Sequence, residues 1–132
     1  MKLLILHGPN MNLFGIRSSK KGENITLDKI NRYIRRFVRN KNIDLKIMQT
    51  HSESKAVAYL HRNRRKFNGL ILAPGPWKYS GYILKETLDI IELNTIIIML
   101  DNNKNLFSDN KCFMDDNILI SYEQAISEYA SE

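Results

Sequence analysis

Short and nearly unbroken apolar runs alternate along this chain with segments whose apolar residues recur every three or four positions. The runs occupy residues 3–6, 45–48, 70–72, 95–100 and 118–120. Strands that are buried on both faces of a parallel sheet are apolar throughout, whereas half-exposed strands alternate between apolar and polar residues. We therefore predict five buried strands.

The segments between these runs have the spacing of amphipathic helices. A first helix is predicted to begin after Thr26, which is a favourable N-cap, with Asp28 in its first turn. A second helix is predicted over residues 53–66, and a short fourth over residues 122–129. The third is predicted from about residue 80, with four apolar residues at helical spacing: Ile83, Leu84, Leu88 and Ile91.

Alternating strands and helices require right-handed crossovers and a parallel sheet covered on both faces. The 132 residues are enough for one such unit with a sizeable core. We therefore predict a single α/β domain over residues 1–132. Its fold is expected to be a flavodoxin-like three-layer sandwich, with a five-stranded parallel sheet of order 2-1-3-4-5.

Composition narrows the class of protein. Apolar residues make up 43% and charged residues 26% of the chain, as in ordinary globular proteins. The net charge of +6 favours anionic partners. Cys112 is the only cysteine, so no internal disulfide can form, and nothing in its sequence surroundings marks it as a nucleophile. With no signal-like or membrane-spanning apolar segment, we expect a cytoplasmic protein without a membrane partner.

In this fold class, ligands bind beyond the carboxyl ends of the strands. Four predicted loops meet there, at residues 7–24, 49–53, 73–80 and 100–105. The first is long, polar and Gly-containing, which is typical of a functional loop such as a lid. Together the loops offer these candidate side chains for a site: His7, Arg17, His51, Glu53, Trp77, Tyr79 and Asp101. Of these, Trp77 is expected to be a packing residue.

These loops carry no pattern typical of a cofactor site. The sequence GPNMNLFG at residues 8–15 is neither a dinucleotide-binding fingerprint nor a P-loop. His7, His51 and His61 lack the close pairing that zinc sites usually have. We expect no metal and no cofactor.

An arginine stripe on the first predicted helix raises nucleic-acid binding as an alternative. Its members, Arg32, Arg35, Arg36 and Arg39, are spaced to share one helix face, and a second basic cluster follows at residues 62–66. Such stripes are most often the solvated face of an amphipathic helix, which is the interpretation we favour.

Several motifs resemble those of the type II 3-dehydroquinate dehydratases. They are HGPNMNLFGIR at residues 7–17, Thr26-Leu27 opening the first helix, Gln49-Thr50 ending the second strand, and Pro74-Gly75 after the third. The resemblance implies a flavodoxin-like subunit that assembles as trimers into a dodecamer. It also implies dehydration of 3-dehydroquinate without a cofactor, with the loop at residues 7–24 acting as the substrate lid.

Matched position by position, this sequence keeps few of the family's catalytic residues. The arginine that lowers the pKa of the base corresponds to Arg17, and the lid asparagine near the ordered water corresponds to Asn12. The family's tyrosine base falls on Gly22, its substrate-holding asparagine on Ala73, and its histidine acid on Met99. A glycine and a thioether cannot exchange protons with a substrate.

The substrate-binding positions have changed as well. By the same matching they are Glu86, Tyr79, Leu100, Asp101 and Lys111, of which Tyr79 replaces a histidine. Lys111 lies beside Asn110, where the family has an arginine. Asp101 would face the substrate carboxylate, and two like charges about 4 Å apart cost on the order of 4 kcal/mol at an effective dielectric near 20.

Three functions remain open at this point. The first is a homologue that has lost most of its catalytic residues and binds another small ligand, for which an anion is one candidate. The second is a divergent but active dehydratase that converts 3-dehydroquinate to 3-dehydroshikimate in the shikimate pathway. The third is a basic oligomer that binds nucleic acid, which only the arginine stripe supports.

Overall fold

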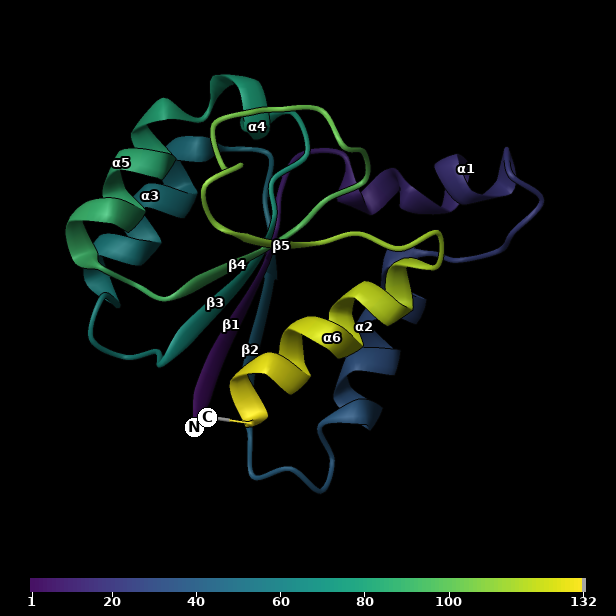
Figure 1. The fold of residues 1–132 in the computed structure, drawn as a ribbon, viewed down its shortest axis with the longest axis horizontal. Helices are drawn as coiled ribbons and strands as arrows, with labels where there is room; N and C mark the ends of the chain where they lie inside the picture. Colours follow the sequence, from purple (N-terminus) through teal and green to yellow (C-terminus); the bar gives the residue numbers. More distant parts are fainter. Residues whose placement is uncertain (132) are drawn as a thin grey trace.

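The computed structural model describes residues 1–131 and contains one five-stranded parallel sheet (Figure 1). The strand order is β2-β1-β3-β4-β5, with every neighbouring pair parallel. The strands are β1 (Lys2–His7), β2 (Asp44–Gln49), β3 (Gly69–Ala73), β4 (Thr95–Ile98) and β5 (Lys111–Phe113). The predicted α/β flavodoxin-like fold and its 2-1-3-4-5 order are confirmed.

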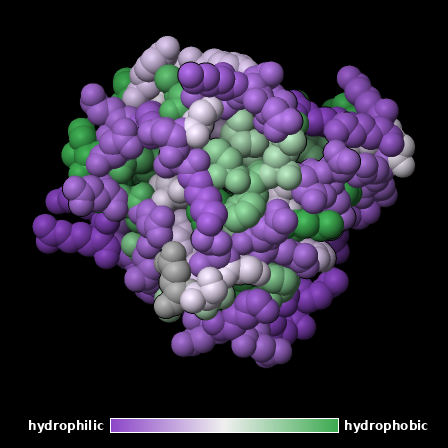
Figure 2. All heavy atoms as spheres, in the orientation of Figure 1, coloured by the Kyte–Doolittle hydropathy of each residue, from purple (hydrophilic) through white to green (hydrophobic). Residues whose placement is uncertain are grey.

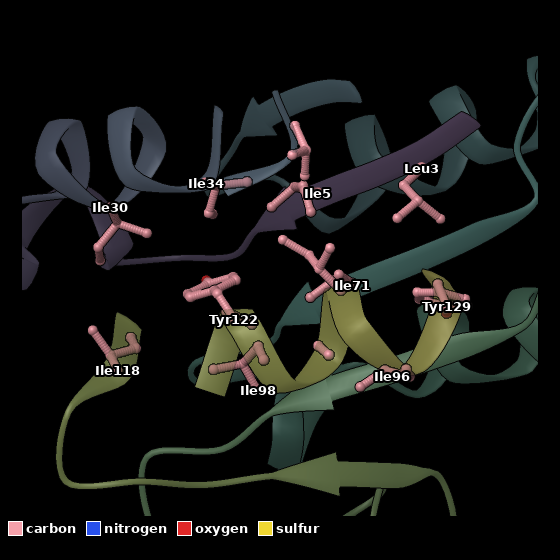
Figure 3. Close-up of a cluster of buried hydrophobic side chains, with 14 of the residues drawn as sticks. Leu3, Ile5, Ile30, Ile34, Ile71, Ile96, Ile98, Ile118, Tyr122 and Tyr129 are labelled. Atoms are coloured by element: carbon pink, nitrogen blue, oxygen red, sulfur yellow. The ribbon is translucent and has the colours of Figure 1, made fainter. Parts of the chain in front are cut away.

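Two helical layers cover the sheet. Helices α2 (Leu27–Phe37) and α6 (Ile118–Ala130) pack on one face, where Leu3 and Ile5 of β1 point. Figure 3 shows side chains of α2 and α6 meeting those of β1, β3 and β4. Helices α3 (Glu53–Arg62) and α5 (Tyr82–Ile91) cover the other face, toward which Leu4 and Leu6 point. Because successive residues of a strand point to opposite faces, an unbroken apolar run supplies both cores.

Helix α2 follows its sequence signals. The Thr26 side chain accepts a hydrogen bond from the Lys29 backbone N–H, as an N-cap does, and Ile30 and Ile34 are buried. Helix α3 begins at the predicted residue but ends at Arg62, four residues before the predicted end.

The prediction of a fifth strand at residues 118–120 is wrong, because these residues open α6. The Asn117 side chain caps this helix by accepting a hydrogen bond from the Leu119 backbone N–H. The observed fifth strand, β5, is three residues long and largely exposed at the sheet edge. A three-residue apolar run fits a buried helix segment as well as a strand, and the polar edge strand gave no comparable apolar signal.

The expected loop at residues 7–24 is partly helical. It contains a 3₁₀ turn, η1 (Met11–Leu13), and a short helix, α1 (Phe14–Ser19), which projects from the body of the molecule (Figure 1). The hydroxyl of buried Ser18 donates to the Gly15 and Ile25 carbonyls and accepts from the Ile25 N–H. This network fastens the end of α1 to the chain that leads into α2.

Helix α5 presents apolar residues to both the core and the solvent. Leu84 and Leu88 are buried, whereas Ile83 and Ile90 are 64% and 71% exposed. Figure 2 shows a surface that is mostly hydrophilic, with apolar patches between the polar side chains. Within residues 1–131, no helix has both the length and the apolar character needed to cross a membrane.

Candidate functional site

The sheet has a topological switch point between β1 and β3. The chain leaves β1 to form β2 on one side of it and later forms β3 on the other side. Ligands of open α/β sheets bind in the crevice that opens at such a point. Here the loops after β1 and β3 enclose a cavity of about 320 Å³ with the end of β4.

Two glycines let these loops approach each other closely. The Gly8 N–H donates to the Ala73 carbonyl at 2.8 Å, and a Cβ on Gly8 would lie only 2.7 Å from the Pro74 carbonyl oxygen. Gly75 has a φ of +55°, and a Cβ there would lie 2.7 Å from the carbonyl oxygen of Pro9. Glycine is therefore required at both positions by contact, and at Gly75 also by backbone conformation.

The cavity is lined mainly by apolar side chains and by backbone. The apolar and glycine residues are Pro9, Met11, Phe14, Ala73, Pro74, Gly75, Pro76, Ile98, Met99 and Leu100. Asn10, Arg17, Lys78 and Tyr79 supply the polar side chains. No aspartate, glutamate or histidine is among these residues.

Two of the substituted catalytic positions form part of the cavity wall. Ala73 is 2% and Met99 8% exposed, and both lie where β3 and β4 end. The Met99 thioether lies 3.9 Å from the Asn105 side-chain nitrogen. Tyr79 also lines the cavity and is half-exposed. Both Ala73 and Met99 therefore lie at the carboxyl ends of the strands, the edge where the sequence predicts a ligand site.

An ion pair stands beside the cavity. The Lys78 Nζ lies 2.5 Å from Asp101 Oδ2, and Asp101 Oδ1 accepts a hydrogen bond from the Asn103 backbone N–H. The Lys78 hydrogen bond, followed by the Asn103 hydrogen bond and the positive charge of Arg17, holds the pKa of Asp101 below its ordinary value. Asp101 itself does not line the cavity. Lys78 therefore offsets the repulsion that Asp101 was predicted to exert on an anion.

Sequence reasoning missed Lys78. Its only signal is its place between Trp77 and Tyr79 in the loop after β3, which was expected to reach the ligand site. Its pairing with Asp101 joins the short helix α4 (Trp77–Ser80) to the loop after β4, and the two residues lie 23 positions apart in the chain. No helical or strand pattern in a single sequence indicates a contact between residues so far apart.

Arg17 lies on α1 and lines the mouth of the cavity. It is exposed, and within residues 1–131 it has neither a hydrogen bond from its side chain nor an ion pair. Its guanidinium group is thus available to an anionic ligand.

Four other predicted site residues lie away from the cavity lining. Asn12 is exposed in η1, and Gly22 is exposed in the turn after α1, with a φ of +78°. Glu86 is exposed on α5. Lys111 pairs with Glu128 of α6, an ion pair that fastens β5 to α6. None of the four is among the residues that line the cavity.

The rim residues His7 and Glu53 have structural contacts. His7 is fully buried, with Nε2 at 2.8 Å from Asn31 Oδ1 and Nδ1 at 3.0 Å from the Tyr122 hydroxyl. Burial lowers the pKa of His7 from 6.5 to about 4, so the ring is neutral near pH 7. Glu53 Oε2 accepts a hydrogen bond from the Leu84 backbone N–H and thereby ties α3 to the first turn of α5.

The remaining candidates, Trp77, His51 and Cys112, have surroundings that do not favour a catalytic role. Trp77 is 4% exposed in the short helix α4 (Trp77–Ser80) and packs in the α3 and α5 core. Exposed His51 accepts a hydrogen bond from the Asn10 backbone N–H at 3.4 Å. Burial, with the nearby Asp109 charge, raises the pKa of the Cys112 thiol, which keeps the thiol protonated. Within residues 1–131, no cluster of three or more acidic, histidine or cysteine side chains could hold a metal ion.

This arrangement suits binding better than proton transfer. The walls offer apolar contact, Arg17 offers an unpaired cation, and Lys78 is engaged by Asp101. General acid–base catalysis needs groups that change protonation near the working pH. Tyr79 is the only hydroxyl-bearing side chain in the lining, and Lys78 and Arg17 are the only cations.

Comparison with protein families finds a match that covers most of the chain. Residues 1–111 match the family described as dehydroquinase class II. The 3-dehydroquinate dehydratase of Pelotomaculum thermopropionicum is 30% identical over 102 residues, which cover 77% of this chain and 71% of that protein. That of Desulfitobacterium hafniense is 31% identical, with coverage of 76% and 69%.

Solved structures share the fold over the whole chain. The type II dehydroquinase of Butyrivibrio crossotus superposes with a TM-score of 0.88 at 20% identity, covering 100% of this chain and 98% of that one. A 3-dehydroquinate dehydratase-like protein from Bifidobacterium longum superposes with a TM-score of 0.75 at 13% identity, covering 99% and 96%. At these identities the superpositions establish the fold alone.

Proposed function

Because the chain belongs to the class II dehydroquinase family, we propose that it is a family member whose site binds a small ligand but no longer dehydrates 3-dehydroquinate efficiently. One observation carries the proposal. The cavity at the switch point has an apolar wall at Ala73 and Met99, and its lining contains no carboxylate or imidazole. Gly22, at the position matched to the base, is exposed outside that lining.

The size of the expected loss follows from the chemistry. Abstraction of a proton beside a ketone needs an activated base, and the departing hydroxyl needs an acid. Each such group contributes about 10² to 10⁴ in rate, so losing both lowers the rate by about 10⁴ to 10⁸. Arg17 remains at the cavity, and in the family the matching arginine lowers the pKa of the base. Here Gly22 occupies the position of that base, so Arg17 has no base to act on.

The direct test is the dehydration assay on purified protein, which follows the enone product, 3-dehydroshikimate. The Pelotomaculum thermopropionicum dehydratase serves as the positive control. We expect a rate at least about 10⁴ lower than that of the control. A rate within tenfold of the control would overturn the proposal.

The second candidate is an active, divergent dehydratase of the shikimate pathway. The retained Arg17 at the switch-point cavity favours it. If the reaction takes place in this cavity, Arg17→Gln will lower the rate. The control is Lys20→Gln, which removes the same charge from a nearby exposed residue outside the lining and will leave the rate unchanged. Equal rates for both variants and the wild type would assign any turnover to another source.

We also propose self-association, as trimers or as a dodecamer, because α5 exposes apolar surface. Tyr82, Ile83 and Ile90 are each at least 64% exposed, and Glu86 lies on the exposed side of the same helix. Apolar side chains exposed together on one element are typical of an interaction surface. Light scattering coupled to size-exclusion chromatography tests this proposal, and a monomer at all concentrations would contradict it.

Nucleic-acid binding has weaker support. The four arginines of the stripe are exposed, and Arg32 pairs with Asp28 on the same helix at 3.1 Å. This is the pattern of a solvated helix face. Retention on nucleic acid at low salt that falls steeply with added salt would revive the alternative, and no retention at low salt would remove it.

A further inference from the structure

We infer that the cavity at the switch point selects a ring-shaped monocarboxylate with an apolar body, of the benzoate kind, over a polyhydroxylated ring acid. The inference deepens the proposed function and rests on its premise that this cavity is a ligand site. It follows from the chemistry of the wall, from the balance of charge at the mouth and from the volume enclosed.

The wall is suited to an apolar ring. Phe14, Ile98, Met99 and Leu100 contribute hydrocarbon or thioether surface, and Ala73 adds a methyl group. A ring that carries several hydroxyl groups would place some of them against these side chains without partners. Each buried hydroxyl that loses its hydrogen bonds lowers affinity by about tenfold or more.

The mouth is suited to a single negative charge. Asp101 balances the charge of Lys78 through their ion pair, which leaves the guanidinium of Arg17 as the surplus cation of the group. A guanidinium presents parallel N–H donors that match the two oxygens of a carboxylate. A second anionic group on the ligand would find no further unpaired cation in the lining, since Lys78 is engaged by Asp101.

The cavity has room for a ligand of this kind. Its volume of about 320 Å³ accommodates a single six-membered ring with one carboxylate. The volume is also at the lower end of the range for small-molecule pockets.

The test is a calorimetric titration of the full chain with three probes: benzoate, benzamide and quinate. We expect benzoate to bind at least tenfold more tightly than quinate, because its ring has no hydroxyl group to desolvate. Benzamide keeps the ring but lacks the charge, and we expect it to bind about tenfold more weakly than benzoate. Arg17→Gln should weaken benzoate binding about tenfold, while the matched control Lys20→Gln should leave it unchanged.

Three results would overturn the inference. They are the absence of saturable benzoate binding, quinate affinity equal to or greater than that of benzoate, and an equal loss of affinity in Arg17→Gln and Lys20→Gln. The last would mean that net charge alone attracts the anion. Turnover of 3-dehydroquinate is measured separately, so an active enzyme would refute the proposed function, whereas the affinity ranking alone decides the ligand class.

Discussion

Burial keeps the imidazole of His7 neutral at the end of β1, and two hydrogen bonds fix the position of its ring. With Asn31 Oδ1 accepting from Nε2–H, Nδ1 is left to accept the hydroxyl proton of Tyr122, and both rings are buried. Protonation of Nδ1 would place a positive charge in a desolvated site. This explains why the histidine, which the sequence offered as a rim residue for chemistry, serves to join β1 to α2 and α6.

The buried His7 predicts a specific pH dependence of stability. Its pKa is about 4 in the folded protein and about 6.5 when exposed, so the unfolded chain binds the proton more readily. The contribution of His7 to the free energy of unfolding is therefore fully present above pH 6.5. It falls by about 3 kcal/mol as the pH is lowered from 6.5 to 4. Urea unfolding at several pH values measures the effect.

Replacement of His7 provides the control for that measurement. His7→Gln should lower stability near pH 7 and flatten its dependence on pH between 6.5 and 4. His61→Gln, at an exposed position on α3, should leave the pH dependence unchanged. If the slope of wild-type stability in this range persists in His7→Gln, another group is responsible.

Alanine substitutions at two glycines with positive φ, Gly75 and Gly22, distinguish the cost of backbone strain from the cost of a close contact. Gly75→Ala should cost about 2–4 kcal/mol, because it adds left-handed strain to a Cβ placed 2.7 Å from the Pro9 carbonyl oxygen. Gly22→Ala has the strain without the contact, since nothing lies within 4 Å of its added Cβ, and should cost about 1 kcal/mol. Equal losses in chemical denaturation would contradict the close packing of the two loops.

At the residue level, the sequence predicted which strand ends line the cavity but not the side-chain contacts between its loops. Ala73, the last residue of β3, and Met99, directly after β4, could be expected near a ligand site because the carboxyl ends of parallel strands meet at one edge. Lys78 could not, because its role depends on Asp101 in another loop. Lys111 was placed one position from a family residue, yet its side chain turns to Glu128.

Among the elements, the strongest periodic patterns were the most informative. The unbroken apolar runs of β1, β3 and β4 and the amphipathic face of α2 were correctly predicted. Residues 118–120 were predicted as a strand but begin a helix, because an apolar run of three residues is too short to show a period. The observed edge strand, β5, was missed because it is largely exposed and has no apolar run. The helical turns at residues 11–19 were not predicted. The hydrogen bonds between Ser18 and Ile25, which fasten the end of α1, join residues seven positions apart and follow no helical or strand period.

The cap of α6 tests this reassignment. Asn117→Ala should destabilise the protein by about 1 kcal/mol, because the Leu119 N–H loses its acceptor at the start of the helix. Asn102→Ala, at an exposed position in the loop after β4, is the matched control and should change stability by less than about 0.5 kcal/mol. Equal stability of the two variants in thermal or urea unfolding would contradict a capped helix at this position.

For the molecule as a whole, the exposed apolar residues of α5 predict how copies associate. Ile90→Lys should dissociate the proposed assembly, because a lysine charge would be desolvated in an apolar contact. Ile16→Lys, at a site on α1 that is 58% exposed, tests whether any added lysine has the same effect. We expect light scattering to give a smaller mass for Ile90→Lys only. An unchanged mass would place the contact elsewhere.

The whole account depends on a family fold that retains its ligand cavity without its proton-transfer groups. The most direct measurement is the rate at which the purified chain converts 3-dehydroquinate to the enone, beside the Pelotomaculum thermopropionicum dehydratase. We expect a rate that is lower by at least about 10⁴. A rate within tenfold of that dehydratase, lost in Arg17→Gln and kept in Lys20→Gln, would contradict it.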